Sequence, residues 1–182
     1  MRLFIGIPLD FAVAHELSAV SAQFRSKDDG LRWSAPESWH VTLQFLGNTS
    51  PEQCRCVAES LRGLRSQPVP IQLESLGFFD RAGVLFAGVR LTPELSTLQR
   101  QVVAATAPCG FPAEDRAYHP HITLARGKGK EGRHGILRLK NKIRQQPAFS
   151  AIDAREFLLY ESFTEPSGSR YEVRERFPFT EV

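Results

Sequence analysis

The strings HVTL at residues 40–43 and HITL at residues 121–124 decide the fold of this 182-residue chain. Each string is a histidine, a β-branched residue, a threonine and a leucine, and His121 follows His40 by 81 residues. With so few histidines and threonines in the chain, chance gives two HxT triplets only about 2% of the time. The repetition therefore indicates a duplicated structural element.

Both strings fit a β-strand that is apolar on one side. Residues i and i+2 of a strand point to the same face, so His40 shares a face with Thr42, and His121 shares one with Thr123. The intervening β-branched residues and leucines point the other way, into apolar packing. Each string thus predicts a strand that presents an imidazole and a hydroxyl together.

The sequence around each string repeats the same order of elements. In the first half, a strand at residues 2–7 precedes a helix capped by Asp10 and a strand at 39–46 that carries the first string. In the second half, a strand at 84–90 precedes a helix that begins at Thr92 and a strand at 120–125. At the offset of 81, residues 3–7 fall on 84–88. We therefore expect an α+β fold over residues 1–182, a single bilobal domain of two antiparallel sheets flanked by helices, with a pseudo-twofold axis and a central cleft.

Four further elements complete the prediction. A helix is expected from Ser50 to about Arg65, because serine, proline and glutamine form a capping box at its start. A strand at 71–79 pairs with 84–90 as a hairpin. The glycine-rich stretch GKGKEGRHG reads as a mobile loop before a helix at about 136–145, and a last hairpin joins 157–163 to 171–179 around a turn at 165–168.

Composition excludes several classes of protein. Hydrophobic residues make up 42% and charged residues 24%, which is typical of a globular protein and not of a disordered one. No apolar run approaches the roughly 20 residues that a membrane helix needs. The three cysteines have no metal-like spacing and are expected to be reduced thiols in a cytoplasmic protein.

Charge is distributed unevenly. The net charge is only +3, yet residues 126–144 hold eight lysines and arginines against one glutamate. A basic segment on an otherwise acidic chain favours a polyanionic partner. The alternative is a solvated loop and helix face without a partner.

Two histidines on symmetry-related strands suit phosphoryl transfer. One neutral imidazole can remove a proton from the attacking group while the other, protonated, donates to the leaving oxygen. Thr42 and Thr123 can hydrogen-bond the phosphate, and Arg126, two residues beyond Leu124, is expected to point toward the cleft and stabilise charge on it. This chemistry requires no metal and no cofactor.

Other residues allow other interpretations. His119 and His121 share a strand face and, with His40, could hold a metal ion, although no carboxylate motif accompanies them. His15 and His134 are expected to be solvated. Four aromatic residues could either stack on a nucleobase or pack in the core: Trp33, Trp39, Phe45 and Tyr118. Packing in the core is favoured for Trp39 and Phe45.

Longer strings resemble a known family. RLFIGIPL at the start, RWSAPESWHVTLQFLGN, YHPHITLARGK and the closing EFLLYESFTEPSGSRYEVRERFPF resemble the 2H phosphoesterase superfamily. Within it, the chain is similar to the RNA 2′,3′-cyclic phosphodiesterases, also called 2′-5′ RNA ligase-like proteins. The resemblance covers essentially the whole chain and includes both histidines, both threonines and Arg126.

The resemblance implies a bilobal fold and a specific reaction. Enzymes of this kind open a terminal 2′,3′-cyclic phosphate on RNA to a 2′-phosphomonoester without metal. By carry-over, His121 is the base that activates water and His40 is the acid, while Thr42, Thr123 and Arg126 bind the phosphate. The pseudo-twofold symmetry leaves the opposite assignment of base and acid open at this stage. Tyr118 and Phe45 are the candidates for contacts to the rest of the substrate. Some relatives join RNA ends through a 2′-5′ linkage, so a reverse, ligating activity is open.

The partners that this interpretation implies are RNA 3′ ends bearing a 2′,3′-cyclic phosphate. No membrane and no obligate protein partner are expected, and the protein should be a monomer. Two alternatives remain open at this stage: a cyclic phosphodiesterase of a small nucleotide metabolite, and a noncatalytic module that binds RNA ends. Dependence of affinity on RNA length and salt separates the first alternative, and turnover excludes the second.

Overall fold

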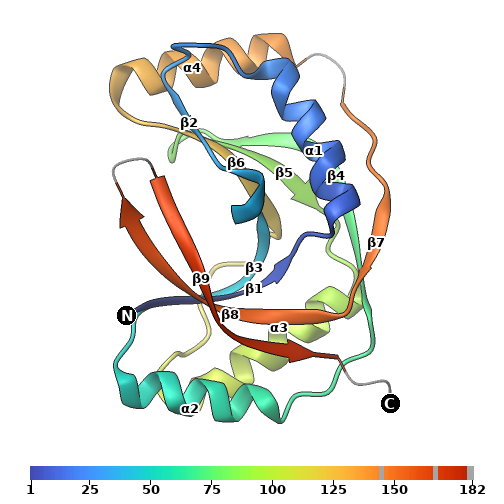
Figure 1. The fold of residues 1–182 in the computed structure, drawn as a ribbon, viewed down its shortest axis with the longest axis vertical. Coiled ribbons are helices and arrows are strands. Elements are labelled where there is room, and N and C mark those ends of the chain that lie inside the picture. Colours follow the sequence, from blue (N-terminus) through green and yellow to red (C-terminus); the bar gives the residue numbers. More distant parts are fainter. Residues whose placement is uncertain (144–145, 166–167, 180–182) are drawn as a thin grey trace.

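The computed structural model describes residues 1–143, 146–165 and 168–179. It consists of two antiparallel sheets, each covered by helices on one face (Figure 1). The strands are β1 (Arg2–Pro8), β2 (Leu31–Trp33), β3 (His40–Asn48), β4 (Val69–Phe79), β5 (Val84–Val89), β6 (His121–Gly127), β7 (Ala151–Ala154), β8 (Glu156–Glu165) and β9 (Gly168–Pro178). The helices are α1 (Phe11–Phe24), α2 (Pro51–Arg62), α3 (Pro93–Thr106) and α4 (Gly129–Lys142), with 3₁₀ turns η1 (Pro36–Ser38) and η2 (Ala107–Cys109).

The two sheets confirm the predicted fold class, but the lobes are not the two halves of the chain. One sheet has the order β3-β1-β8-β9 and the other the order β2-β6-β5-β4-β7. The first sheet therefore takes the C-terminal hairpin, and the second takes β2 from the N-terminal half. β3 and β6, which carry the two HxT strings, contact each other between the lobes.

The helices are exchanged in the same symmetric way. α1 follows β1 of the first sheet but lies with α4 over the second sheet (Figure 1), where Glu16 accepts hydrogen bonds from Ser150 just before β7. α3 follows β5 of the second sheet but packs against β3 and beside α2. This reciprocal exchange joins the lobes.

The main hydrophobic core is continuous between the two lobes. It includes Ile5, Val41 and Leu43 behind the first HxT strand and Ile122 and Leu124 behind the second, each with at most 2% of its surface exposed. A second, small cluster of Phe4, Leu158 and Tyr160 lies apart from that core. The alternation predicted for the HxT strands is therefore confirmed: their apolar residues face the helices.

Three predicted helix starts are confirmed. Asp10, Ser50 and Thr92 each accept a hydrogen bond from a backbone N–H of the first turn, and Ser50 forms the capping box with Gln53. α2 ends at Arg62 rather than near Arg65. The fold therefore starts its helices at the positions that side-chain chemistry dictates.

The prediction for the basic glycine-rich stretch was wrong, because α4 begins at Gly129 and not near residue 136. The glycines there serve close packing rather than flexibility. A Cβ on Gly132 would lie 2.4 Å from the backbone of Gly127, and one on Gly135 would lie 2.4 Å from the Asp29 carbonyl oxygen. Only glycine lets α4 approach β6 and the residues before β2 so closely. The predicted end of this helix at 144–145 and positions 166–167 of the predicted turn lie outside the described residues.

The cysteine prediction was also wrong. Cys56 on α2 and Cys109 on η2 form a disulfide, with their Cα atoms 5.7 Å apart, and only Cys54 is a free thiol. The packing of α2 beside α3 brings together two residues that are 53 positions apart in the chain, which spacing alone cannot reveal. The short strand β7 was likewise not predicted.

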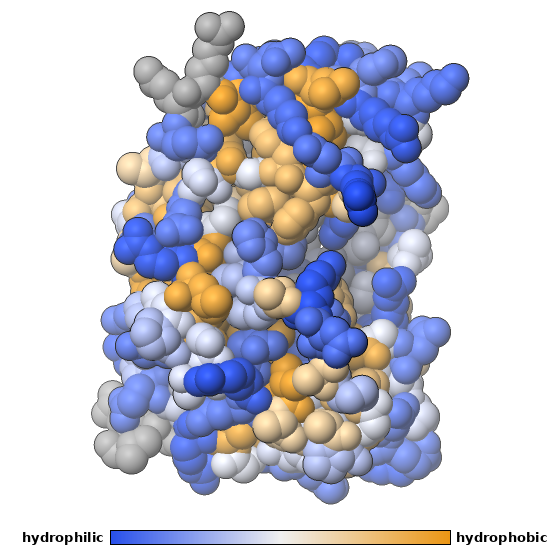
Figure 2. All heavy atoms as spheres, turned by 180° about the vertical axis from the view of Figure 1, so that it is seen from behind, coloured by the Kyte–Doolittle hydropathy of each residue, from blue (hydrophilic) through white to orange (hydrophobic). Residues whose placement is uncertain are grey.

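Among the described residues, no helix has both the length and the apolar character required to cross a bilayer. On the face that Figure 2 shows, apolar patches stand among hydrophilic side chains, and the surface is hollowed between the upper and lower halves. The large apolar side chains that are exposed come from separate elements; they include Phe11, Phe45, Leu91 and Leu137.

Candidate functional site

The two HxT strands have the same ladder geometry. In β3, Thr42 lies opposite Gly6 of β1, and in β6, Thr123 lies opposite Phe86 of β5. Gly6 and Phe86 are 80 positions apart, whereas Thr42 and Thr123 are 81 apart. β3 and β6 therefore keep the predicted offset of 81, and β1 and β5 differ from it by one residue. The repeat is therefore most faithful in the strands that carry the histidines.

A bulge follows each threonine at the equivalent position. The pairing skips Leu43 in β3 and Leu124 in β6, so two successive residues on each strand are buried against the helices. Strict alternation would turn Arg126 away from the histidine face. The bulge returns Arg126 to that face, and it does the same for Phe45 in the first lobe.

Both histidine rings are fixed by the same hydrogen bond. Nδ1 of His40 lies 2.7 Å from the carbonyl oxygen of Ser38, and Nδ1 of His121 lies 2.7 Å from the carbonyl oxygen of His119. A carbonyl oxygen only accepts, so Nδ1 carries the hydrogen in both rings. In the neutral rings the basic nitrogen is therefore Nε2, and within the described residues it has no hydrogen-bond partner.

His40 lies among aromatic rings. The Phe4 ring centroid is 4.5 Å away, that of Tyr171 5.2 Å and that of Tyr160 5.7 Å. Burial among these rings is the main reason that the pKa of His40 falls to about 4, and the positive charges of His121 and Arg126 lower it further. Both of these charges belong to β6, so the second HxT strand lies close enough to act electrostatically on the histidine of the first.

His121 has a similar but more open environment. Phe79 and Phe86 lie with ring centroids 4.9 and 5.4 Å from it, and the exposed His119 ring is 6.2 Å away. Burial lowers the pKa of His121, and the charges of His119, Arg126 and Arg116 add to the effect. Both histidines are thus held in the neutral form when no anion is bound.

The phosphate-binding candidates lie beside the histidines. Thr42 and Thr123 are half-buried on the histidine face of their strands, and Arg126 donates a hydrogen bond to the Thr123 hydroxyl at 3.5 Å. The Tyr118 hydroxyl donates to the carbonyl oxygen of Thr42 at 2.9 Å, which joins the segment before β6 to β3, and burial raises its pKa. Tyr118 therefore aligns the lobes, and its hydroxyl hydrogen is already in use.

The other aromatic candidates separate clearly. Trp39 is only 5% exposed and belongs to the core, as expected. Phe45, also expected to pack in the core, is 60% exposed, on the same face of β3 as His40. Trp33 is half-buried, and its indole N–H donates to Asp29. Of these three, Phe45 is the one whose side chain is mostly exposed.

His40, His119 and His121 do not form a metal-binding group in the described part of the chain, where no cluster of three histidine, cysteine or carboxylate side chains has the required geometry. The aromatic walls around the histidines were not predicted. β1 is apolar along nearly its whole length, so its pattern does not tell which side chains, such as Phe4, pack against His40.

Two antiparallel sheets, exchanged helices and a pair of HxT strands facing one cleft define a 2H phosphoesterase fold. Residues 12–161 match the family model described as the 2′-5′ RNA ligase superfamily. The chain belongs to this family.

Known proteins agree with this assignment. The chain is 28% identical to an RNA 2′,3′-cyclic phosphodiesterase of Archaeoglobus fulgidus over 94% of its own length and 96% of the relative. It is 29% identical to the protein of that name from Thermotoga maritima, covering 95% and 92%. The crystal structure of E. coli LigT complexed with 3′-AMP superposes with a TM-score of 0.81 at 26% identity, covering 99% and 98% of the two chains. The prediction of a phosphodiesterase enzyme is confirmed.

Proposed function

We propose that this protein hydrolyses the 2′,3′-cyclic phosphate at the 3′ end of an RNA to a 2′-phosphomonoester by paired-histidine acid–base catalysis. The observation that carries the proposal is the matched pair of imidazoles, each with Nδ1–H held by a carbonyl and Nε2 left free. Two free nitrogens on strands that contact each other are what an acid–base pair acting on one phosphate requires. The names of the curated relatives supply the substrate class.

In the proposed reaction, Nε2 of His121 takes a proton from water as the water oxygen bonds to phosphorus. The bond from phosphorus to O3′ breaks on the opposite side, and Nε2 of His40 gives its proton to O3′. Phosphorus stays on O2′, and the product is a single isomer. Arg126 and the two threonine hydroxyls hold the nonbridging oxygens, where charge develops.

His40 must be protonated to act as the acid, but its surroundings favour the neutral ring when no substrate is bound. The pKa of His40 is about 4 without substrate. A phosphate anion between the two rings favours the imidazolium form and raises the pKa of both histidines. Substrate binding therefore makes one protonated imidazole accessible, and the proposed reaction proceeds from the form in which His40 carries that proton and the more exposed His121 is neutral.

The same site accommodates 2′-5′ ligation as a second outcome. If the 5′-hydroxyl of another RNA replaces water, an identical proton transfer yields a 2′-5′ phosphodiester. Nothing in the chemistry of the two histidines distinguishes these nucleophiles, so water at high concentration favours hydrolysis.

The test is an assay on a short RNA that ends in a 2′,3′-cyclic phosphate, with EDTA present and the 2′- and 3′-phosphate products resolved. We expect turnover to the 2′-phosphate alone, and loss of turnover in both His40→Gln and His121→Gln. Folding of both variants is checked by thermal unfolding. A folded wild-type enzyme that gives no product in EDTA, or gives a mixture of isomers, contradicts the proposal.

The alternatives have distinct signatures in the same assay. A module that only binds RNA ends would retain the RNA without turnover. An enzyme for a small nucleotide metabolite would turn over a cyclic mononucleotide at least as well as the RNA.

A further inference from the structure

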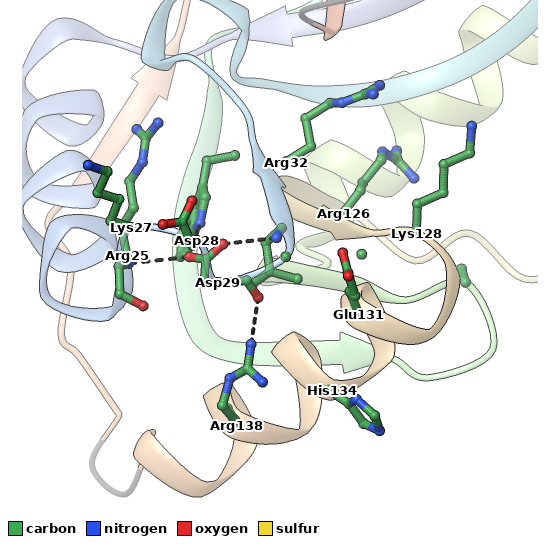
Figure 3. A pocket seen from close by; sticks show the side chains of 16 residues that line it. Arg25, Lys27, Asp28, Asp29, Arg32, Arg126, Lys128, Glu131, His134 and Arg138 are labelled. Carbon is green, nitrogen blue, oxygen red and sulfur yellow. Dashed lines mark hydrogen bonds between the residues drawn. The ribbon is translucent and has the colours of Figure 1, made fainter.

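A basic groove begins where the histidine site ends. It has a volume of about 1210 Å³ and lies between the segment 25–33, the end of β6 and the first turns of α4 (Figure 3). Arg126 lines this groove and also contacts Thr123 of the HxT strand. The groove and the histidine site are therefore joined through one side chain.

The groove has more basic than acidic side chains, and in the described part of the chain its basic side chains are not paired with carboxylates. Its basic side chains are Arg25, Lys27, Arg32, Arg126, Lys128 and Arg138, and its acidic ones are Asp28, Asp29 and Glu131. Among the described residues, none of these six cations forms an ion pair, although such pairs are frequent on the other lobe, where Arg62, Arg174 and Arg176 each pair with a glutamate. The groove thus keeps its positive charge available to a ligand.

Two of these cations are placed directly side by side. Arg32 of β2 lies opposite Arg126 of β6 in the ladder, and Figure 3 shows the two side chains and Lys128 extending in the same direction. Like charges at opposed positions of a sheet repel each other. Their juxtaposition is unfavourable in the empty protein and becomes favourable when an anion lies between them.

The carboxylate of Asp29 holds the groove wall and does not neutralise it. It accepts hydrogen bonds from the backbone N–H groups of Ser26 and Leu31 and from the Trp33 indole. Arg138 of α4 donates to the Asp29 carbonyl oxygen at 2.9 Å (Figure 3). Asp29 is only 9% exposed. Its carboxylate therefore stabilises the segment that carries Arg25 and Lys27 and is not available to pair with the groove cations.

We propose that this groove binds the phosphodiester backbone of the single-stranded RNA nucleotides that precede the reacting end, with Arg32 and Lys128 nearest the histidine site and Arg25 and Lys27 farthest from it. This inference rests on the proposed function for the direction of the strand. A chain whose last phosphate lies between His40 and His121 continues past Arg126, and the next anions along it meet the unpaired cations. The groove, of about 1210 Å³, is larger than one nucleotide fills, and its six basic side chains are more than a single phosphate needs.

The experiment compares two substrates in three proteins. The substrates are 2′,3′-cyclic AMP and an RNA of about eight nucleotides that ends in a 2′,3′-cyclic phosphate. The proteins are the wild type, Arg25→Gln/Lys27→Gln in the groove, and Arg55→Gln/Arg62→Gln on the distant helix α2 as a control with the same loss of charge. Binding of the 2′-phosphorylated RNA product is measured in parallel by fluorescence anisotropy over a salt series.

The groove variant should lower the ratio of kcat/KM for RNA to that for the mononucleotide by about 20-fold at about 0.1 M salt, because two phosphate contacts are lost. Its slope of log affinity against log salt should fall by about 1.4. The α2 control should change neither quantity. Asp28→Asn, which removes a negative charge from the same groove, should act in the opposite direction and tighten RNA binding.

An equal loss on both substrates, an equal loss in the α2 control, or no effect of any groove variant overturns the inference. These outcomes are distinct from failure of the proposed function, in which wild type turns over neither substrate. The anisotropy measurement of RNA binding requires no turnover, so it tests the groove even if the wild type is inactive on both substrates.

Discussion

The two HxT strands share one backbone design and differ in what surrounds it. Both fix Nδ1 of the histidine on a carbonyl two residues earlier, and both have a bulge after the threonine. After the bulge, however, the first strand presents Phe45 and the second presents Arg126. The scaffold is thus symmetric where we propose that protons are transferred, and asymmetric where we propose that the rest of the substrate is held.

The burial of the two histidines differs in the same sense. Three aromatic rings surround His40 and bring its pKa to about 4, while His121 is more open beside the exposed His119. Gly6 contributes to this difference, because a Cβ there would lie 3.2 Å from the His40 ring. The duplicated element therefore places its two histidines in unequal environments.

Removal of either histidine should have the largest effect. His40→Gln and His121→Gln should each lower kcat by about 10³-fold, since acid–base catalysis contributes about 10²–10⁴. The double variant should be little worse than either single one, because the two groups act in one step. Single-turnover rates on the cyclic-phosphate RNA measure this. A double variant whose loss is the product of the two single losses would show that the histidines act independently.

Arg126 should come next. Arg126→Gln should lower kcat/KM by about 10²-fold through loss of a charge-assisted contact to the phosphate. Arg126→Lys should recover part of the loss, because it keeps the charge but not the paired donors. Steady-state kinetics on both substrates measure this. If kcat/KM falls for RNA but not for the cyclic mononucleotide, Arg126 binds the RNA in the groove and not the reacting phosphate.

The burial of His40 predicts an acid sensitivity of the fold. Its folded pKa of about 4 lies below the unfolded value of 6.5, so the unfolded chain binds more protons between these values. The contribution of neutral His40 to the free energy of unfolding is fully present above pH 6.5. It is lost as the pH falls toward 4, by up to about 3 kcal/mol. Urea unfolding at pH 7 and pH 4 should show a smaller loss in His40→Gln than in wild type. An identical loss in both proteins would contradict the effect of burial.

Phe45 should have the smallest of these effects. Phe45→Ala should raise KM by about 10-fold with little change in kcat, because stacking on a base contributes about 1–3 kcal/mol, and Phe45→Tyr should restore it. The exposed ring makes a loss of stability small. A fall in kcat without a change in KM would remove Phe45 from the substrate-holding surface.

The sequence was sufficient for the fold class, the HxT strands and the helix caps at Asp10, Ser50 and Thr92, because these depend on local periodicity and local hydrogen bonds. It was insufficient where distant segments meet. The Cys56–Cys109 disulfide depends on how α2 packs beside α3, and the glycines of α4 indicated a loop when they in fact permit close packing.

The candidate site shows the same limit. Both histidines, both threonines and Arg126 were predicted, but alternation alone gave no reason for Arg126 to share their face, and the bulge supplies it. The groove residues Arg25, Lys27 and Arg32 were not predicted, because β2 adds to the second sheet from a distant part of the chain.

The central claim is that His121 is the base and His40 the acid, and the pH dependence of kcat/KM in wild type, His121→Gln and His40→Gln tests it most directly. The wild-type profile should be bell-shaped with its maximum below pH 6.5, since burial lowers both pKa values in the free enzyme. His121→Gln should lose the rising acidic limb, and His40→Gln should lose the falling alkaline limb. Loss of the opposite limbs, or a complete bell in both variants, would contradict the account.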